Sequence, residues 1–570
     1  MNRENRYIDH LISKMSLDQK VGALLTLGFA GTLVRQHIID FITKYQCGGL
    51  RLTPHARTFG SYIDPKSGKS VIDVMDFKGY KKGLEPPHVT ASEYQAVLGE
   101  LQALAMGRPL GIPLHFSFDQ EGGTSADFDF GGVNIFPKPM GIRSTGDSRL
   151  AYEVGLAVAR QSRAVGFNWI HSPVLDINVN PENPEVYTRA YSDRIEEIAE
   201  YAIETCKGLK AGGLIGTAKH FPGRGDSAVD AHFEMPIIDA DRQTMLRREL
   251  LPYRALIERK LIPSIMIAHS IFPAFDPVDV ATVSRPILTG LLREEMGFEG
   301  VITTDSMTMG GIAVRYGVAN ACALALAAGA DLVLMKSEGK LVEETIAAIK
   351  AFVADGRIPE RDLDDKVYRV LSLKYEYGLF NQGSNWPEQP EAVLRDPSIV
   401  DLSRLVARRS VLVARDEPQR LPLPKDEPVL VIEQINKCPN DLHWHPGILM
   451  KQCLKYNPKV EYLETAYTWD DDDKANIRAA FERFETIVIT NFYIRAKLSN
   501  NQAITDLLRA NPGKRVIVVT NTPYPLSVPE AAGSLVITFA TSPANIEVVA
   551  GVLFGAVTAE GEWPVEYRLK

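Results

Sequence analysis

One loop of the sequence holds a carboxylate and an imidazole at a spacing suited to proton transfer. In KHFPGRGDSAVDAHFEMP, Lys219–Pro236, Asp230 and His232 are two residues apart. A carboxylate bound to one imidazole nitrogen fixes the tautomer, supports the cationic ring and leaves the other nitrogen free for proton transfer. Asp-x-His also arises by chance, so a structural or idle pair is the alternative. Gly223 and Gly225 are expected to make the loop flexible.

Two further segments place carboxylates after apolar stretches. GVITTD ends on Asp305, and HFSFDQEGG carries Asp119 and Glu121 before a glycine pair that allows a ligand to approach the backbone. Asp305 can attack an anomeric carbon as a nucleophile, and its alternative role is to cap a following helix. Asp119 and Glu121 can accept hydrogen bonds from sugar hydroxyls, or they are buried turn carboxylates.

A fourth segment, SPVLDINVNPENPEVYTRAYSD, places Asp176 after an apolar stretch and Arg189 in the loop that follows. Asp176 and the asparagines two and four residues later resemble the start of a calcium loop. Pro181 and Tyr187, however, stand where such a loop needs glycine and a bidentate glutamate. The sequence therefore predicts no metal, and the chemistry of these groups needs neither a metal nor a redox cofactor.

The elements that must position these residues are eight short apolar runs, most of them apolar throughout, as in parallel strands buried on both faces. Helical stretches lie between them; in one unit Ser284 can cap a helix that Gly297 ends before GVITTD begins. Eight such units within residues 1–375 predict a TIM barrel. The runs are ALLTLGF, GGLRLT, IPLHFSFD, FNWIHSPVLD, GLIGTAKH, PSIMIAH, GVITTD and ADLVLM.

Polar residues gather at the C-terminal ends of five of these predicted strands. They are Asp119, Asp176, the Lys219–His220 pair, His269 and Asp305. This end of a TIM barrel carries the active site. Polar residues that merely open loops explain any one position, but explain five less well. We therefore expect a site here, with Lys219 and His220 donating hydrogen bonds to sugar hydroxyls.

The rest of the chain predicts a second domain and one long insertion. Residues 376–400 are rich in Gly, Asn, Ser and Pro and are interpreted as a linker. Residues 401–570 carry a helix, the strand that follows it, and the runs PVLVIE, TIVITN, RVIVVTN and LVITFAT, which indicate a smaller α/β sandwich with a mainly parallel sheet. The insertion from Pro54 to Ala91 is expected to be a lid or a mobile excursion that can reshape the aglycone side.

Composition narrows the class of protein. The net charge of −8 comes from mixed signs without a basic stripe, so neither nucleic acid nor an anionic membrane is expected as a partner. No apolar run reaches the roughly 20 residues of a membrane span, and the first helix reads as amphipathic rather than as a signal peptide. The five cysteines are scattered, which favours a reducing compartment. We expect a cytoplasmic protein that binds a small saccharide; the oligomeric state stays open.

Five segments, taken in this order, resemble glycoside hydrolase family 3, and more narrowly its bacterial β-N-acetylglucosaminidases. They are DQEGG, SPVLDIN, KHFPGRGDSAVDAH, IMIAHSIFPAFDP and GVITTDSMTMGG. The resemblance covers nearly the whole chain, including a second domain that opens with ARRSVLV and ends near VLFGAVTAEGEWPV. The KHFPG segment with its Asp-x-His distinguishes the hexosaminidase branch from the β-glucosidases. The resemblance implies an exo-acting, retaining hydrolase that releases terminal N-acetylglucosamine from small saccharides or cell-wall fragments.

By this resemblance, Asp305 is the nucleophile, His232 the acid/base and Asp230 its partner. Such a pair sits roughly 5–5.5 Å apart in retaining enzymes, so the loop from Phe221 to Glu234 must fold over the barrel mouth and is expected to move. The residues expected to hold the substrate are Asp119, Asp176, Arg189, Lys219, His220, Arg224 and His269.

Three positions depart from the family pattern. Arg224 stands where many relatives have histidine, and Ala231 where they have serine or threonine. Thr124 stands where an arginine usually follows DQEGG, which puts the conventional amino-sugar pocket in question. The chemistry is therefore better predicted than the sugar.

Other functions remain open at this point. Phosphorolysis is one, because a histidine acid/base repels phosphate less than a carboxylate does and Arg224 adds positive charge; another β-glycoside as substrate is a second. A non-catalytic sugar-binding relative is a third, although the retained Asp230, His232 and Asp305 speak against it. A barrel used only as an assembly scaffold leaves the convergent charges unexplained.

Overall fold

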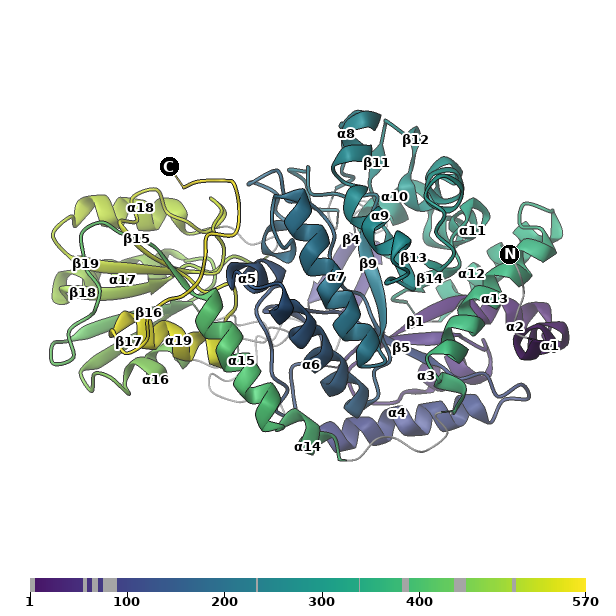
Figure 1. Cartoon of the computed structure of the whole chain (residues 1–570), viewed down its shortest axis with the longest axis horizontal. Helices are drawn as coiled ribbons and strands as arrows, with labels where there is room; N and C mark the ends of the chain where they lie inside the picture. The colour runs from purple at the N-terminus through teal and green to yellow at the C-terminus, as the bar shows by residue number, and fades with distance from the viewer. Residues whose placement is uncertain are drawn as a thin grey trace.

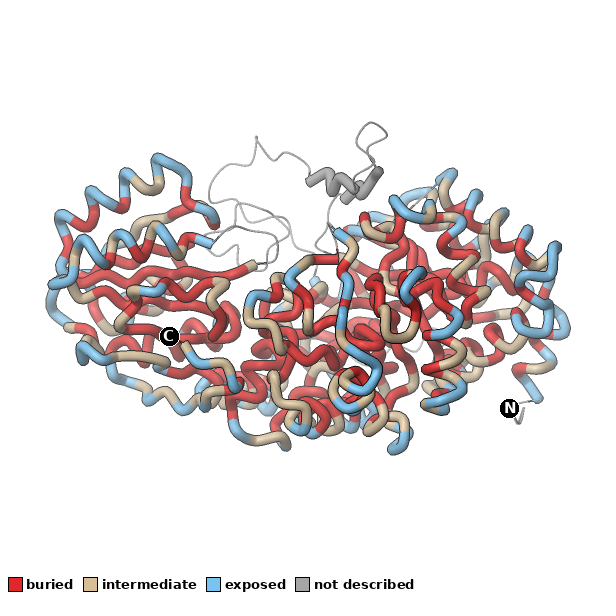
Figure 2. The backbone as a smooth tube through the Cα atoms, turned by 90° about the horizontal axis from the view of Figure 1, so that it is seen from above, coloured by how far each residue is buried: buried red, intermediate tan, exposed pale blue. Residues whose placement is uncertain are grey.

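The chain folds into a barrel and a smaller sheet domain that lie side by side (Figure 1). The computed structural model describes residues 6–54, 90–231, 234–337, 339–381, 389–434, 447–494 and 499–569, with the backbone alone at 59–63 and 70–74. Figure 2 shows that the strands of both parts are buried almost throughout, while exposed residues lie on the surrounding helices and loops.

Eight parallel strands form a closed barrel, and their order around the barrel is their order along the chain. All eight predicted strands are present, and the predicted TIM barrel is confirmed. Their residues are buried on both faces, which explains why the runs are apolar rather than alternating. The strands are β1 (Leu25–Ala30), β2 (Gly49–Thr53), β5 (His115–Phe118), β8 (Trp169–Ile170), β9 (Ile215–Phe221), β10 (Ser264–Ile267), β13 (Val301–Ser306) and β14 (Leu332–Met335).

Helices surround the barrel, with their apolar sides on the strands (Figure 1). They are α1 (Arg6–Lys14), α2 (Leu17–Ala23), α3 (Gln36–Thr43), α4 (Ala91–Met106), α5 (Pro139–Ser144), α6 (Arg149–Val165), η1 (Tyr187–Arg189), α7 (Ile195–Ala211), α8 (Arg242–Arg247), α9 (Leu251–Glu258), η2 (Ala281–Val283), η3 (Pro286–Glu295), α10 (Gly310–Tyr316), α11 (Val318–Ala328), α12 (Lys340–Ala354) and α13 (Glu360–Glu376). Short strand pairs in the loops are β3 (Phe59–Ile63) with β4 (Ser70–Val74), β6 (Gln120–Gly122) with β7 (Ser125–Ala126), and β11 (Ile271–Phe272) with β12 (Asp276–Val280).

The helix between β10 and β13 begins and ends where the sequence predicts. The Ser284 hydroxyl accepts a hydrogen bond from the Ile287 amide at 3.3 Å, which satisfies a donor of the first turn of η3. Gly297 follows the helix with a φ of 68°, a left-handed conformation that favours glycine, and β13 starts four residues later. This turn directs the chain straight into the strand that carries Asp305.

The second domain is a six-stranded sheet in the order β15-β20-β19-β18-β16-β17, parallel except for β15. One strand, β17, is absent from the sequence prediction, because it lies at the sheet edge, where most of its residues are only half-buried and two of them are glutamates, so it does not form an apolar run. The strands are β15 (Leu412–Asp416), β16 (Val429–Gln434), β17 (Val460–Thr465), β18 (Thr486–Thr490), β19 (Arg515–Thr520) and β20 (Ser534–Ile537). The helices are α16 (Ile448–Cys453), α17 (Asp471–Arg483), α18 (Asn501–Ala510) and α19 (Pro543–Leu553).

The two parts are joined by helices and by the C-terminal segment. Between residues 376 and 400 the described residues form η4 (Leu379–Asn381), α14 (Pro390–Leu394) and the start of α15 (Pro397–Ser410), which runs between barrel and sheet (Figure 1). The C-terminal segment returns to the barrel, where the Ser192 hydroxyl donates to the Pro564 carbonyl at 2.7 Å. The amides of Glu566 and Tyr567 donate to the Asp193 carboxylate at 2.7 and 3.1 Å.

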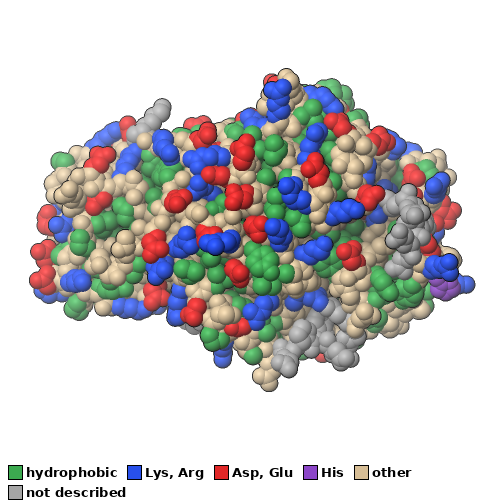
Figure 3. Space-filling model, viewed as in Figure 1, with side chains coloured by type: hydrophobic (Ala, Val, Ile, Leu, Met, Phe, Trp, Pro, Cys, Tyr) green, Lys and Arg blue, Asp and Glu red, His purple; other side chains and the backbone are tan. Residues whose placement is uncertain are grey.

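The insertion between β2 and α4 lies largely outside the described residues. Its β3 and β4 form an antiparallel pair whose backbone lies near α10, the helix that follows the Asp305 strand. On the face drawn in Figure 3, Lys and Arg side chains are interspersed with Asp and Glu. Within the described part of the chain, no single helix is long and apolar enough to cross a membrane; only α10 and α11 taken together, bent by 94°, pass that test.

Candidate active site

The C-terminal ends of β5 and β9 bring three charged side chains into contact. Lys219 places its amine 2.7 Å from an Asp119 oxygen and 2.5 Å from a Glu121 oxygen. Arg51, a buried residue of β2, pairs with the other Asp119 oxygen. Burial alone would raise the pKa of Asp119, but Lys219 and Arg51 hold it well below its ordinary value. Asp119 is thus an ionised acceptor, and 33% of its side chain is exposed to the barrel mouth.

Glu121 supports Arg189 from below the mouth. The two side chains form a bidentate pair with N–O distances of 2.7 and 2.9 Å, and both are almost fully buried. Burial opposes ionisation of Glu121, but Arg189 and Lys219 lower its pKa to about 2. Because only 2% of its side chain is exposed, Glu121 orients Arg189 rather than presenting an oxygen at the mouth.

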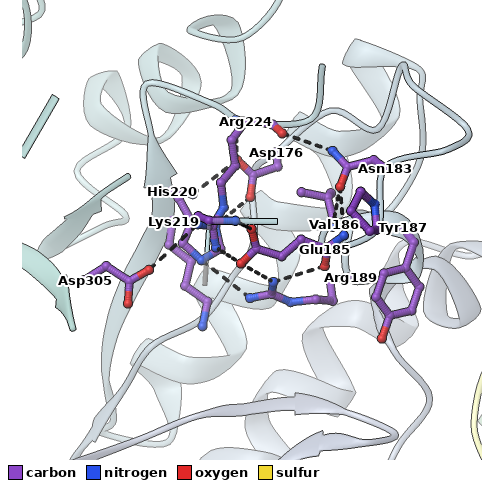
Figure 4. Close-up of polar contacts among 12 residues, drawn as sticks. Asp176, Asn183, Glu185, Val186, Tyr187, Arg189, Lys219, His220, Arg224 and Asp305 are labelled. Carbon is purple, nitrogen blue, oxygen red and sulfur yellow. Dashed lines mark hydrogen bonds and ion pairs between the residues drawn. The ribbon is translucent and has the colours of Figure 1, made fainter. Parts of the chain in front are cut away.

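Asp176 and His220 form a buried pair behind this arrangement (Figure 4). His220 Nδ1 lies 2.6 Å from an Asp176 oxygen, and its Nε2 lies 3.4 Å from Nη2 of Arg189. Burial lowers the pKa of His220 well below its ordinary value, and the cations of Arg224 and Arg189 lower it further. A neutral ring that donates from Nδ1 to Asp176 and accepts at Nε2 from Arg189 satisfies both contacts. His220 therefore orients Arg189 in this structure, and donation to a sugar hydroxyl stays a prediction.

Asp305 stands at the end of β13, facing Arg224 (Figure 4). One Asp305 oxygen accepts the Ser306 amide at 2.7 Å, and the other lies 3.9 Å from Arg224. Arg224 is buried and pairs with Glu185 at 2.8 Å. The Asp305 side chain is 16% exposed, so it is held in place while part of it reaches the mouth. This is the arrangement a nucleophile needs.

His269 is buried beneath that strand end. Its Nδ1 lies 2.7 Å from the Thr282 hydroxyl, and its Nε2 lies 3.0 Å from the carbonyl oxygen of Ser306. The ring therefore fixes the backbone immediately after Asp305. Its role as a substrate ligand stays a prediction.

The loop that carries Asp230 is fastened to the loop after β8. The Ala231 amide donates to Glu185 at 3.2 Å, and Asp230, 8% exposed, accepts the Glu234 amide on its carbonyl at 3.1 Å. A Cβ on Gly225 would lie 1.6 Å from the carbonyl oxygen of Ile177, so this glycine serves close backbone approach rather than flexibility. His232 lies outside the described residues, and the acid/base role stays a prediction.

Sequence reasoning missed four residues of the site. Arg51 is a charged residue inside an apolar run, a pattern that could have identified it. Lys336 is an exposed residue that directly follows β14, at the strand end where the other charges gather. Asp127 pairs with Arg51 at 2.6 Å, and Glu185 lies in a loop without local signal.

The family is decided by a match over the barrel: residues 16–373 fit the model of the glycosyl hydrolase family 3 N-terminal domain. The chain belongs to this family. The chain is 30% identical over 349 residues to the β-N-acetylglucosaminidase/β-glucosidase of Cellulomonas fimi, covering 59% of the chain and 60% of that protein. It is 30% identical over 359 residues to β-hexosaminidase A of Pseudoalteromonas piscicida, covering 59% of each. The chain thus matches about six tenths of the length of these two relatives.

One solved structure extends the likeness to the second domain. A family 3 β-N-acetylglucosaminidase from a Paenibacillus species superposes with a TM-score of 0.86 at 27% identity, covering 98% of this chain and 100% of that one. The predicted family is therefore confirmed, and so is the architecture of a barrel followed by a separate sheet domain.

Proposed function

We propose that this family 3 protein is a retaining exo-β-N-acetylhexosaminidase that releases terminal N-acetylglucosamine from small saccharides or cell-wall fragments. The observation that carries the proposal is the placement of Asp305. Its partly exposed carboxylate ends a barrel strand at the same mouth where Asp119 presents ionised oxygens. The names of the similar proteins in Cellulomonas, Pseudoalteromonas and Paenibacillus support the choice of sugar.

In the first step, an Asp305 oxygen bonds to C1 of the sugar as the bond between C1 and the glycosidic oxygen breaks. His232, as the imidazolium, gives its proton to the leaving oxygen, and Asp230 stabilises the charged ring. In the second step, a water oxygen bonds to C1 while His232 takes its proton and the C1–Asp305 bond breaks. Two inversions return the β configuration at C1.

The remaining residues bind and orient the sugar. Asp119 accepts hydrogen bonds from sugar hydroxyls, and Lys219 and Arg189 donate to sugar oxygens while Glu121 fixes the fork of Arg189. Asp176 and His220 lock Arg189 from behind. Arg224 stands beside the nucleophile, with a guanidinium nitrogen 3.9 Å from an Asp305 oxygen.

The same proposal places the protein in the cytoplasm. Its support is chemical: Cys47, Cys206, Cys322 and Cys453 are free thiols buried in the core. Burial raises the pKa of the Cys47 thiol to about 11 and that of Cys322 to about 12, which keeps both protonated and unreactive. Cys438 lies outside the described residues. A count of free thiols in protein purified without reductant tests the point; a disulfide would contradict it.

The substrate is tested with p-nitrophenyl glycosides of β-GlcNAc, β-GalNAc, β-glucose and β-xylose, in phosphate and in a phosphate-free buffer. We expect turnover of β-GlcNAc at the same rate in both buffers, with free β-GlcNAc as the first product seen by proton NMR. Formation of a sugar 1-phosphate in the phosphate buffer would show that the reaction is phosphorolysis. Activity on one of the other glycosides alone would show that the substrate carries a different sugar. Calorimetric binding of N-acetylglucosamine without any turnover would indicate a sugar-binding protein.

A further inference from the structure

The loop after β8 is held by a residue of the second domain. Tyr493, which follows β18, donates its hydroxyl to the carbonyl oxygen of Pro184 at 2.9 Å. Its ring meets that of Tyr187 edge to face, with centroids 5.1 Å apart and planes at 88°. Both contacts cross from the sheet domain to the barrel, within five residues of Arg189.

Tyr493 is itself fixed before it reaches the barrel. Its amide donates to the Asn521 side chain at 2.8 Å, and the Asn521 amide group returns a bond to the Tyr493 carbonyl at 2.9 Å. The side chain is buried between the two parts of the molecule. Because its backbone is hydrogen-bonded on both sides and its side chain is buried, Tyr493 has a fixed position from which to contact the barrel.

The segment that Tyr493 holds is strained. Tyr187 has a φ of 30°, in the left-handed region that a bulky residue rarely adopts. Its ring is enclosed by Tyr493 on one side and by the amine of Lys138, 4.2 Å from the ring centroid, on another. Lys138 also donates to the Tyr187 hydroxyl. These contacts keep a conformation that places Arg189 two residues further on.

The segment 183–189 is also hydrogen-bonded to the loop 221–231, which we call the catalytic loop, through the residues on both sides of Pro184. Asn183 donates to the carbonyls of Arg224 and Gly225 at 3.1 and 3.0 Å, as Figure 4 shows for Arg224. Glu185 accepts from Arg224 at 2.8 Å and from the amide of Ala231 at 3.2 Å. Pro184 is therefore the point where a contact from the second domain reaches Arg189 in one direction and the Asp230 loop in the other.

We propose that Tyr493 is a positioning residue of the active site, through which the second domain holds the segment 183–189 and, by way of it, the loop 221–231. This inference rests on the proposed hydrolysis of β-N-acetylglucosaminides and assigns the second domain a part in it. Tyr493 touches no reacting atom. It acts by keeping Arg189 and the catalytic loop in their positions relative to Asp305.

The test compares Tyr493→Phe with the wild type and with Tyr567→Phe in the full-length protein. Tyr493→Phe keeps the ring but removes the bond to Pro184, whereas Tyr567 meets the barrel through its backbone amide, so Tyr567→Phe is the matched control. Loss of one hydrogen bond predicts a rise in KM for p-nitrophenyl β-GlcNAc of about three- to tenfold, with Tm within a few degrees of the wild type. The control keeps the wild-type KM.

Hydrogen–deuterium exchange gives a second readout that needs no activity. We expect faster exchange in peptides covering 183–189 and 221–231 for Tyr493→Phe, and wild-type exchange there for Tyr567→Phe. Unchanged exchange in both segments overturns the inference, as does an unchanged KM in an active enzyme. If the wild type hydrolyses no glycoside, the proposed function fails, while faster exchange in the variant still supports the coupling.

Discussion

Both ends of the barrel bury charge, and the two clusters differ in what is left open. At the end where the strands begin, Asp331 precedes β14, accepts from Arg369 at 2.8 Å and from the Ile302 amide at 2.8 Å, and pairs with Arg293. Its side chain has no exposed area. Nearby, Lys374 donates to two backbone carbonyls at 2.6 and 2.8 Å. The Asp331 carboxylate and the Lys374 amine are both fully buried and directed into the protein.

At the end where the strands finish, the charged side chains are also paired with one another, but some of the carboxylates remain partly exposed to solvent. Asp119 keeps 33% of its side chain exposed and Asp305 keeps 16%, although each has a cationic neighbour. Lys219, Glu121 and Arg189 behind them are buried. The difference separates stability from function: a buried cluster whose acceptors are all satisfied holds the fold, whereas one that leaves carboxylate oxygens at the surface is able to bind and react.

The largest effect is expected at Asp305. Asp305→Ala should lower kcat on the order of 10⁵-fold, because it removes the carboxylate that we propose as the nucleophile, while Tm stays near that of the wild type. Steady-state kinetics and thermal unfolding measure the two quantities. Asp355→Ala, an exposed carboxylate at the end of α12, is the control and should change neither. Substantial residual turnover by Asp305→Ala would assign the nucleophile elsewhere.

The opposite result is expected at the other end of the barrel. Asp331→Ala leaves Arg293 and Arg369 buried without their carboxylate, which should lower the free energy of unfolding by about 3–5 kcal/mol. Because the cluster is remote from the mouth, kcat of the folded variant should equal that of the wild type. Urea unfolding followed by circular dichroism measures the loss. A fall in kcat without a fall in stability would remove the distinction between the two clusters.

A smaller effect is expected from a change in Arg189, which forms a buried bidentate pair with Glu121 behind the barrel mouth. Arg189→Lys retains the charge but cannot span both oxygens of Glu121, so it loses one charge-assisted bond and the fork geometry. We expect KM to rise about 10- to 100-fold with a smaller change in kcat. Arg149→Lys, which alters a surface pair with Asp147, is the control. Equal KM values for both variants would show that the fork has no part in binding.

The smallest effect concerns pH. His220 has a pKa well below its ordinary value because it is buried beside Arg224 and Arg189. Below about pH 6.5 the unfolded chain binds a proton that the native ring does not, so stability falls with acidification, by about 1.4 kcal/mol per pH unit for this one group. His220→Gln should flatten the fall between pH 6.5 and 5 in urea unfolding. His10→Gln, on the exposed side of α1, should leave it as in the wild type. An identical slope in His220→Gln would mean that the native ring is charged.

Much of the fold follows from local pattern, and less of the site does. The eight barrel strands could be predicted because burial on both faces requires continuous apolar runs. The strand β17 could not, because this half-buried edge strand carries glutamate at two of its six positions. Asp119, Asp176, Lys219 and Asp305 were predicted from their places at strand ends, where the closed barrel brings them together. The support of Arg189 by His220, and of the Pro184 segment by Tyr493, depends on contacts between residues far apart in sequence, which periodicity does not reveal.

The central claim, that Asp305 forms a bond to the sugar, is tested most directly by trapping that bond. In His232→Ala, p-nitrophenolate still leaves without a proton, but water is no longer activated, so the glycosyl-enzyme should accumulate. Intact-protein mass spectrometry after mixing with p-nitrophenyl β-GlcNAc should show the mass of one N-acetylhexosaminyl group, and peptide mapping should place it on Asp305. An adduct on another residue, or a burst of p-nitrophenolate with no adduct on Asp305, would contradict the account.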